Sequence, residues 1–283
     1  MAASNTAFGG ENPFTQAGSP ALPASFAERV REAIDRSELM LAFQPQADTD
    51  SGRLSGFEAL ARWQLSDGTV IPPDVFIPMA ESNEAIHLLG EWALRRACET
   101  TMGWMRAGVT NTPVAVNVSP RQLEEPGFAR QVLGVLSETG LPADHLKLEL
   151  TETTIYQHNA TTRETLTQLR GAGVRLVLDD FGTGYSSLAL LRRIPVEALK
   201  IDKLFVQDMI ENRAAASIVR AVIDLAHALG IQVVAEGVET VEQRLFLRAY
   251  RCDRIQGYLL SRPLPPEEVP DFIRRSAAPP TAG

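Results

Sequence analysis

The stretch MLAFQPQADTDSGRLSGFEALARWQ, residues 40–64, determines which form of an α/β fold this chain can adopt. It contains two strand-like runs, at about 40–48 and 54–64, which are separated only by the short polar segment ADTDSGR at 47–53. A crossover between parallel strands needs a dozen or more residues and usually contains a helix. We therefore expect the two runs to pair as an antiparallel hairpin.

Further along the chain, strand-like runs alternate with helical stretches. The other strands are expected at about 113–118, 146–151, 174–179, 197–202, 231–236 and 254–259. The helical stretches include 26–37, 84–107, 126–139, 160–172, 213–229 and 239–249, and several end at a glycine, which commonly closes a helix. Length alone would allow one large domain or two small ones. Eight strands alternating with helices over about 250 residues predict a modified (β/α)8 TIM-type barrel with its first strand antiparallel.

The two ends of the chain have a different composition from the middle. The first residues are rich in Ala, Gly, Ser, Pro and Asn without hydrophobic periodicity, and the chain ends in SAAPPTAG. We expect a disordered leader at 1–25, the barrel at 26–275 and a flexible tail at 276–283. The N-terminus lacks the basic start and apolar segment of a secretory signal, and no apolar run approaches the roughly 20 residues that span a bilayer. A cytoplasmic location without a membrane segment is the expectation.

Charge and cysteine content exclude some classes of function. The net charge of −8 argues against DNA as a partner, because nucleic-acid binding needs a basic face. Cys98 and Cys252 lack metal-ligand spacing and indicate neither a disulfide framework nor a zinc site. Because the net charge is negative, binding of a substrate that carries phosphates would require bound cations.

Polar residues stand at the ends of successive strands, where a barrel of this kind carries its reacting groups. They are Glu58, Arg62, Asn117, Glu149, Glu152, Asp179, Asp180, Lys200, Asp202, Glu236, Glu239 and Gln256. Each alone has an ordinary explanation as a solvated loop residue, a helix N-cap or a turn residue. Several carboxylates that converge on one mouth would repel one another unless divalent cations neutralised them.

The donor types indicate Mg²⁺ or Mn²⁺ rather than zinc, because no His or Cys lies at any of these positions. A bend at the end of its strand could bring both Asp179 and Asp180 to the same mouth. The pair could then serve two ions about 3.5–4 Å apart, which suits in-line hydrolysis of a phosphodiester. Lys200 would hold the attacking water or the charge that develops on the phosphate, unless it is a solvated lysine. The segment FGTGYSS at 181–187 could bind phosphate or fold over the site as a flexible loop.

The chain resembles the EAL-domain cyclic di-GMP phosphodiesterases over about residues 26–270. The family tripeptide stands here as Glu58-Ala59-Leu60. Other shared blocks, in family order, are FQP (43–45), PPDVFIPMAE (72–81), NVSP (117–120), ELTET (149–153), DDFGTGYSSL (179–188), LKIDK (199–203), AEGVET (235–240) and QGYLLSRPLP (256–265). Departures from the pattern, SNEAI at 82–86 and Arg251, fall outside the carboxylate ring.

The resemblance implies hydrolysis of cyclic di-GMP to linear 5′-pGpG with two Mg²⁺ or Mn²⁺ ions. By this resemblance, one ion is held by Glu58, Asn117, Glu149 and Asp179, and the second by Asp179, Asp180 and Glu236. Glu58, Lys200 and Glu236 are the implied catalytic residues, with Lys200 orienting water and phosphate and Glu236 as general base. Glu239 is expected to be the carboxylate partner of Lys200.

The resemblance also implies residues around the metals. Gln44, Arg62, Asp202 and Gln256 are the expected substrate contacts, and Glu152 is expected to anchor the loop at 181–187. A homodimer is the family expectation, and a regulatory protein partner is a further possibility. The alternative function is a catalytically silent cyclic di-GMP receptor or protein-interaction module on the same fold. Such proteins usually lack a ring residue, and here the full ring favours the enzyme.

Overall fold

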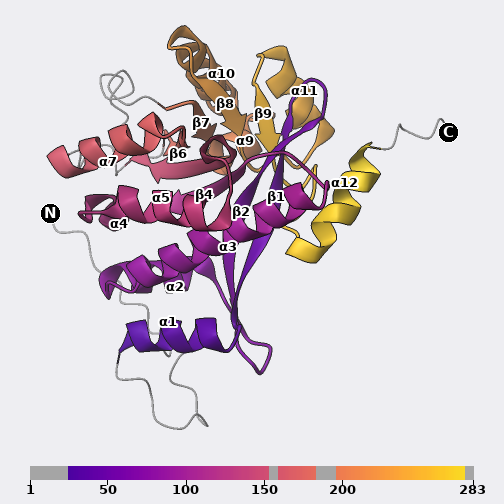
Figure 1. Ribbon diagram of the computed structural model, residues 1–283. Helices are drawn as coiled ribbons and strands as arrows, with labels where there is room; N and C mark the ends of the chain where they lie inside the picture. Colours follow the sequence, from indigo (N-terminus) through magenta and orange to yellow (C-terminus); the bar gives the residue numbers. More distant parts are fainter. Residues whose placement is uncertain (1–24, 153–158, 183–195, 278–283) are drawn as a thin grey trace, which may run out of the picture.

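The computed structural model describes residues 25–152, 159–182 and 196–277, which form a closed barrel with helices outside it (Figure 1). The strands follow the order β1-β9-β8-β7-β6-β5-β4-β2, and β2 pairs back to β1. Their bounds are β1 (Leu39–Asp48), β2 (Leu54–Gln64), β4 (Val114–Val118), β5 (Leu146–Thr151), β6 (Arg175–Phe181), β7 (Ala198–Ile201), β8 (Gln232–Ala235) and β9 (Arg254–Gln256). Neighbours from β2 to β9 are parallel, whereas β1 is antiparallel to both β2 and β9. The modified barrel with its antiparallel first strand is confirmed.

Strands β1 and β2 are longer than the other strands of the barrel. The register of their pairing runs from Leu39 opposite Trp63 to Ala47 opposite Leu54, with an irregularity between Gln46 and Ala47. The far end of β2 pairs with β3 (Val70–Ile71), a short strand that the sequence pattern did not predict. Around this end, α1 (Phe26–Asp35) and α2 (Pro73–Ser82) enclose a second, smaller core that is centred on Trp63 and Phe76.

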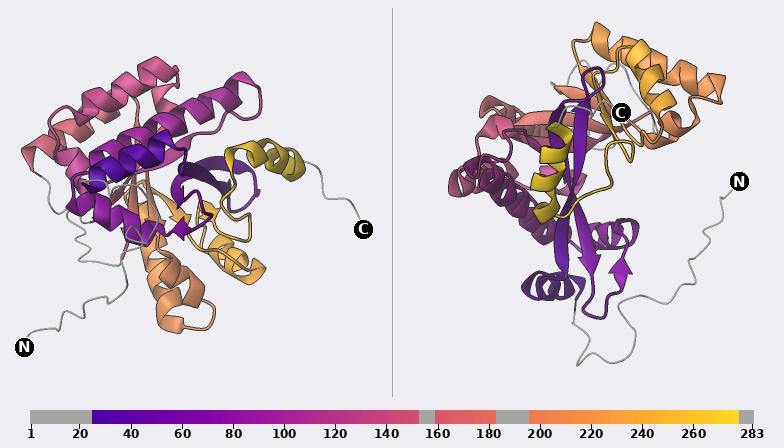
Figure 2. Two further views of the ribbon diagram at one scale, coloured as in Figure 1. Left: turned by 90° about the horizontal axis from the view of Figure 1, so that it is seen from below. Right: turned by 90° about the vertical axis from the view of Figure 1, so that its right-hand side faces the viewer.

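The remaining helices lie around the outside of the barrel (Figure 2). They are α3 (Ile86–Arg106), α4 (Pro120–Glu124), α5 (Phe128–Thr139), α7 (Ala160–Gly171), α9 (Lys203–Asp208), α10 (Arg213–Ala228), α11 (Val241–Ala249) and α12 (Val269–Ala277), with short 3₁₀ turns η1 (Ala143–His145) and η2 (Pro266–Glu268). Together with the outward face of the strands they bury the main hydrophobic core. Within the described ranges, no helix is both long and apolar enough to cross a membrane.

Strand periodicity explains how the barrel presents polar groups inside an apolar wall. On β5, Leu146, Leu148 and Leu150 belong to the main core. Because strand side chains alternate between faces, Lys147 and Glu149 point the other way, into the barrel interior. Of these two, Glu149 lies toward the carboxyl end of β5, whereas Lys147 lies near its start.

The expected ends of the chain fall almost wholly outside the described residues. Within the expected leader, Ser25 is described and caps α1 in a reciprocal capping box with Glu28. Within the expected tail, Ser276 and Ala277 are described and belong to α12. The last barrel strand stops at Gln256 rather than 259. At the next residue, Gly257, the backbone approaches Val238 so closely that a Cβ would lie 2.2 Å from its carbonyl oxygen.

Candidate active site

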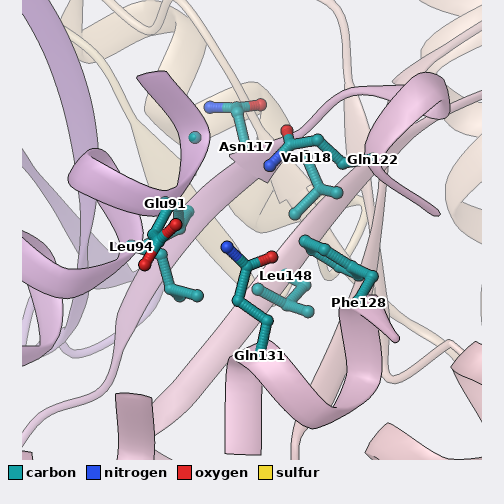
Figure 3. A pocket seen from close by; sticks show the side chains of 10 residues that line it. Glu91, Leu94, Asn117, Val118, Gln122, Phe128, Gln131 and Leu148 are labelled. Atoms are coloured by element: carbon teal, nitrogen blue, oxygen red, sulfur yellow. The ribbon is translucent and has the colours of Figure 1, made fainter. Parts of the chain in front are cut away.

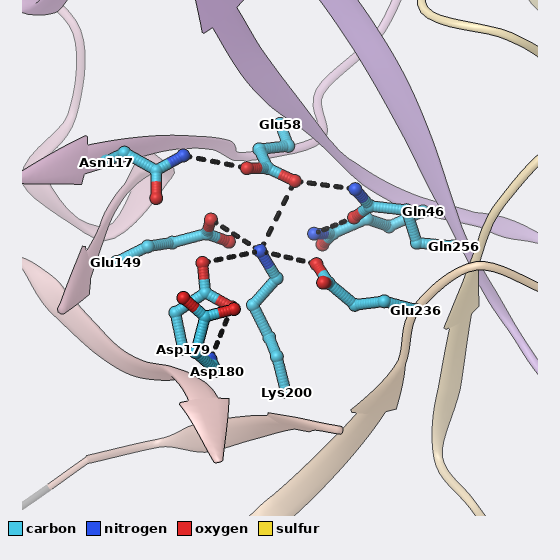
Figure 4. A network of polar contacts seen from close by, with 9 residues as sticks. All are labelled: Gln46, Glu58, Asn117, Glu149, Asp179, Asp180, Lys200, Glu236 and Gln256. Atoms are coloured by element: carbon cyan, nitrogen blue, oxygen red, sulfur yellow. Dashed lines mark hydrogen bonds and ion pairs between the residues drawn. The ribbon is translucent and has the colours of Figure 1, made fainter. Parts of the chain in front are cut away.

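Lys200 on β7 lies at the centre of a ring of carboxylates (Figure 4). Its Nζ atom is 2.7 Å from Glu149 Oε2, 2.7 Å from Glu236 Oε1, 3.2 Å from Asp179 Oδ2 and 3.3 Å from Glu58 Oε2. The lysine side chain is 1% exposed, so these contacts are shielded from water. This burial rules out the alternative interpretation of Lys200 as a solvated lysine.

The carboxylates form two groups that share one residue. Oxygen atoms of Glu58, Glu149 and Asp179 lie within 4.8 Å of one another, and so do oxygen atoms of Asp179, Asp180 and Glu236. When these five carboxyls are ionised, the single Lys200 ammonium leaves an excess of four negative charges. Two divalent cations would balance that excess.

The backbone at the end of β6 brings adjacent aspartates to the same side. Asp180 has a φ of 55°, in the left-handed region, and the pairing of β6 with β7 shifts register between Leu178 and Phe181. The Asp180 amide donates to Asp179 Oδ1 at 2.9 Å, which fixes the turn. Aspartate tolerates this conformation better than most residues. The bend that sequence reasoning required for the pair is present.

The protonation of the ring reflects its crowding. Burial, followed by the charge of Glu58, raises the pKa of Glu149 well above its usual range, and Lys200 opposes this. Burial also raises the pKa of Glu236 to about 8, and burial with the Asp179 charge raises the pKa of Asp180 to about 6. Burial disfavours the ammonium of Lys200, but Asp179, Glu149 and the other carboxylates outweigh it and raise its pKa. The ring holds protons at neutral pH that cations could replace.

Glu58 is the carboxylate with the most hydrogen-bond donors. Asn117 Nδ2 donates to Glu58 Oε1 at 2.7 Å, and Gln256 Nε2 donates to Glu58 Oε2 at 2.5 Å. Burial would raise its pKa, but Lys200 and these amides together lower it. Glu149 Oε1, in contrast, is buried and accepts no hydrogen bond from the described part of the chain. An all-oxygen donor set with an unsatisfied buried oxygen fits a hard divalent cation.

Comparison with known proteins agrees with this geometry. The model of the EAL domain family matches residues 27–263. The chain belongs to the EAL domain family. It is 41% identical over 256 residues to the cyclic di-GMP phosphodiesterase NbdA of Pseudomonas aeruginosa, covering 89% of this chain and 33% of NbdA. The chain spans 29–41% of the length of the curated relatives that it matches first.

Solved structures of EAL domains share the fold. The PaMucR phosphodiesterase in complex with c-di-GMP superposes with a TM-score of 0.81 at 38% identity, covering 86% of this chain and 98% of that one. The EAL domain of Mycobacterium smegmatis DcpA superposes with a TM-score of 0.74 at 42% identity, covering 85% of this chain and 100% of that one. The family resemblance that the sequence motifs carried is confirmed.

The predicted substrate contacts lie around the ring of this EAL barrel. Gln44 on β1 is paired opposite Glu58, and its Nε2 donates to the Ser261 carbonyl at 2.5 Å. Arg62 is half-buried, and its guanidinium donates to the Ala61 carbonyl at 2.8 Å. Burial lowers its pKa, and the charge of Glu58 opposes this. Asp202 is buried and caps α9 through a hydrogen bond from the Leu204 amide.

The two supporting residues have different surroundings. Glu239 is exposed, and its carboxylate accepts from Gln207 at 3.4 Å. Within the described residues, the carboxylates that contact Lys200 are those of Glu58, Glu149, Asp179 and Glu236. The backbone amide of Glu239 donates to Gln243 Oε1 in the capping region of α11, and the structure therefore places Glu239 away from the position expected from the sequence. Glu152 follows β5 and is buried. Most of the loop that it was expected to anchor, at 183–187, lies outside the described residues.

The loop after β4 is fixed by a small network that includes Asn117's neighbour Ser119. The Ser119 hydroxyl donates to Glu81 Oε1 at 2.8 Å, and its amide donates to Gln122 Oε1 at 3.1 Å. Gln122 fits only because Gly90 on α3 has no side chain: a Cβ there would lie 2.1 Å from Gln122 Nε2. Figure 3 shows the cavity beside these residues, of about 10 Å³, which has room for about one water molecule.

Sequence reasoning missed one residue of the site. Gln46 on β1 is 2% exposed, and its Nε2 donates to Gln256 Oε1 at 2.8 Å (Figure 4). Because it stands two positions after Gln44 on the same strand, its side chain shares that residue's face. That alternation was the available signal.

Proposed function

We propose that this EAL domain hydrolyses cyclic di-GMP to linear 5′-pGpG in a reaction that depends on two Mg²⁺ or Mn²⁺ ions. The observation that carries the proposal is the pair of three-carboxylate groups that share Asp179. The names of similar proteins support the substrate: NbdA is called a cyclic di-GMP phosphodiesterase, and PaMucR was solved with c-di-GMP bound.

Glu58, Asn117, Glu149 and Asp179 would hold one ion, and Asp179, Asp180 and Glu236 the other. Two such ions supply positive charge for the phosphate oxygens and lower the pKa of a nearby water. For Asn117 to be a ligand, its amide must turn, because its nitrogen now faces Glu58. Asn117 is exposed, and the rotation would break its hydrogen bond to Glu58.

Residues of the chain would accept the proton of the attacking water and stabilise the charge that develops on the phosphate. The raised pKa of about 8 means that Glu236 holds a proton near neutral pH; once bound cations had displaced that proton, its carboxylate would accept one from the attacking water. The oxygen of that water bonds to phosphorus, the bond from phosphorus to the 3′ oxygen breaks, and the 3′ oxygen takes up a proton from solvent. The linear product carries a 5′-phosphate and a 3′-hydroxyl. Lys200 stabilises the charge that develops on the phosphate oxygens.

The rim residues would grip the dinucleotide. Arg62 offers a guanidinium that can pair with the phosphate that is not cleaved, and a half-buried cation holds such an anion more strongly than a solvated one. Gln44, Asp202 and Gln256 supply hydrogen-bonding groups around the same opening. We further propose a cytoplasmic homodimer that a regulatory protein partner controls, which light scattering in solution and co-purification would test.

Release of pGpG from cyclic di-GMP, measured with Mg²⁺ and with Mn²⁺, tests the proposal. Wild type should release pGpG, ethylenediaminetetraacetate should stop it, and Glu58→Gln should lower the rate while keeping the size of the side chain. The exposed Glu124→Gln on α4 is a matched control that should retain the wild-type rate. If cyclic di-GMP binds tightly but no pGpG is released with either metal, the proposed enzymatic function is wrong and the alternative function as a cyclic di-GMP receptor takes its place.

A further inference from the structure

We propose that Gln46 is a positioning residue for the metal site, acting through Gln256 on Glu58, and this inference rests on the proposed metal binding. Three side chains from three strands form a line: Gln46 Nε2 donates to Gln256 Oε1 at 2.8 Å, and Gln256 Nε2 donates to Glu58 Oε2 at 2.5 Å (Figure 4). All three are buried, with 2% of Gln46, 7% of Gln256 and 4% of Glu58 exposed.

The direction of this line follows from the chemistry of its last member. An ionised carboxylate only accepts hydrogen bonds, so Gln256 must turn its NH₂ group toward Glu58. Its carbonyl oxygen then faces away and needs a donor, and Gln46 provides one. Without Gln46, the carbonyl oxygen of the buried Gln256 amide would lack a hydrogen-bond donor, and this orientation of the amide would lose a stabilising contact.

Backbone register holds the line in place. Gln46 is the Cα partner of Gln256 across the β1–β9 pair, and Gln44, two residues earlier, is the partner of Glu58 across the β1–β2 pair. The antiparallel β1 thus lies between the strands of the two other members. Gln46 also adjoins the irregularity between Gln46 and Ala47, where the pairing with β2 shifts.

The consequence concerns which Glu58 oxygen a cation can use. Among the described residues, Gln256 and Lys200 donate hydrogen bonds to Glu58 Oε2, whereas Asn117, itself an expected ligand, is the one donor to Glu58 Oε1. Gln256 therefore fixes the carboxylate so that Oε1 points to the side of Asn117. Partners that orient a metal ligand in this way typically change metal affinity by about 10–100-fold.

A double-mutant cycle on Mn²⁺ affinity, measured by isothermal titration calorimetry, tests the inference. Gln46→Met keeps the length of the side chain and removes the donor, and we expect it to weaken Mn²⁺ binding by about tenfold or more. Gln256→Met should weaken it by at least as much. If Gln46 acts through Gln256, then adding Gln46→Met to Gln256→Met should produce no further loss.

Stability must be separated from positioning. Thr139→Val removes another buried hydrogen-bonding side chain, at the end of α5, and should lower the melting temperature while leaving Mn²⁺ affinity unchanged. Unchanged Mn²⁺ affinity in a folded Gln46→Met protein, or independent losses that multiply in the double variant, would overturn the inference. Absence of Mn²⁺ binding in wild type would instead overturn the proposed function.

A measurement on wild type guards against variants that fail to fold. The side-chain NH₂ resonances of Gln46 and Gln256 should be protected from solvent exchange, and both should shift when Mg²⁺ is added. A shift in the Gln256 resonances alone, with those of Gln46 unaffected, would contradict coupling between the two amides.

Discussion

The Lys200 ammonium lies 2.7 Å from Glu149 Oε2 in one carboxylate group, and it also contacts Glu236 in the other. A single lysine thus acts as counter-ion to the residues proposed to bind two metals. Each cation that enters must share or replace contacts that Lys200 now makes. Turnover and metal binding should therefore respond to Lys200 in different ways.

Removal of the Lys200 charge should affect the chemical step more than substrate binding. We expect Lys200→Met to lower kcat for cyclic di-GMP by about 100-fold or more, because a buried charge near the reacting phosphate is lost. KM should change far less. Steady-state kinetics would measure both, with the exposed Lys203→Met as a control. A loss of cyclic di-GMP affinity as large as the loss in kcat would indicate that Lys200 mainly binds the substrate.

Metal affinity should increase with pH. The pKa values of Asp180 and Glu236 are raised to about 6 and about 8, so protons occupy these carboxyls below those values. Mn²⁺ must displace the protons, and its affinity should rise as pH increases from about 6 to 8. Calorimetry in buffers of different ionisation enthalpy should show proton release at pH 6.5. An affinity that does not depend on pH would contradict this.

In the presence of chelator, the free energy of unfolding should decrease with pH, whereas metal affinity should increase. The folded chain keeps a proton on Glu236 up to about pH 8, whereas the unfolded chain releases it near the ordinary value of 4.5. Because the native state binds more protons in this window, Glu236 contributes a free energy of unfolding that decreases as pH rises from about 4.5 to 8. Urea unfolding with chelator should show the decrease, and Glu236→Gln should reduce it.

Asp180 allows the backbone and the carboxylate to be tested separately. Asp180→Asn keeps a residue that tolerates the positive φ and removes the charge, so Mn²⁺ binding should weaken while the melting temperature holds or rises. Asp180→Ala removes the same charge but adds strain of about 1–2 kcal/mol. Urea unfolding should distinguish the variants, and equal stability for both would mean that the conformation at position 180 costs little.

The second core beneath the hairpin should contribute measurably to stability. Phe76 is fully buried and meets Trp63 edge to face at 5.5 Å between ring centroids. We expect Phe76→Ala to lower the free energy of unfolding by about 3–5 kcal/mol. Val70 belongs to the same region but is 59% exposed, so Val70→Ala should change stability far less. Similar effects of the two substitutions would mean that this core does not support the fold.

Spacing and periodicity were sufficient to predict the barrel and much of its ring. The short connection at 47–53 forced the hairpin, and Glu149 was predicted because it stands at the end of an expected strand. In contrast, β3 pairs through only Val70 and Ile71, which is too short to leave a periodic signal. The helix expected from 239 begins at Val241, because the Thr240 side chain caps it by accepting from the Gln243 amide.

Side-chain direction beyond the strand ends could not be predicted. Glu239 stands three residues after Glu236, but its backbone amide is bound by Gln243 at the start of α11 and its carboxylate lies beside Gln207. Gln46 was missed for another reason: its place two residues after Gln44 indicates a shared face but not the partner that it meets there. Its partner Gln256 is far away in sequence, and only the closed register of β1 and β9 brings them together.

The reversed direction of β1 links the smaller core to the reaction centre by one continuous strand. From Leu39, which belongs to that core, the chain reaches Gln44 and Gln46 without an intervening loop. An extended strand advances about 3.3 Å per residue, and its alternate side chains share one face. The packing of Leu39 in the smaller core and the placement of the two glutamines therefore depend on the register of the same strand.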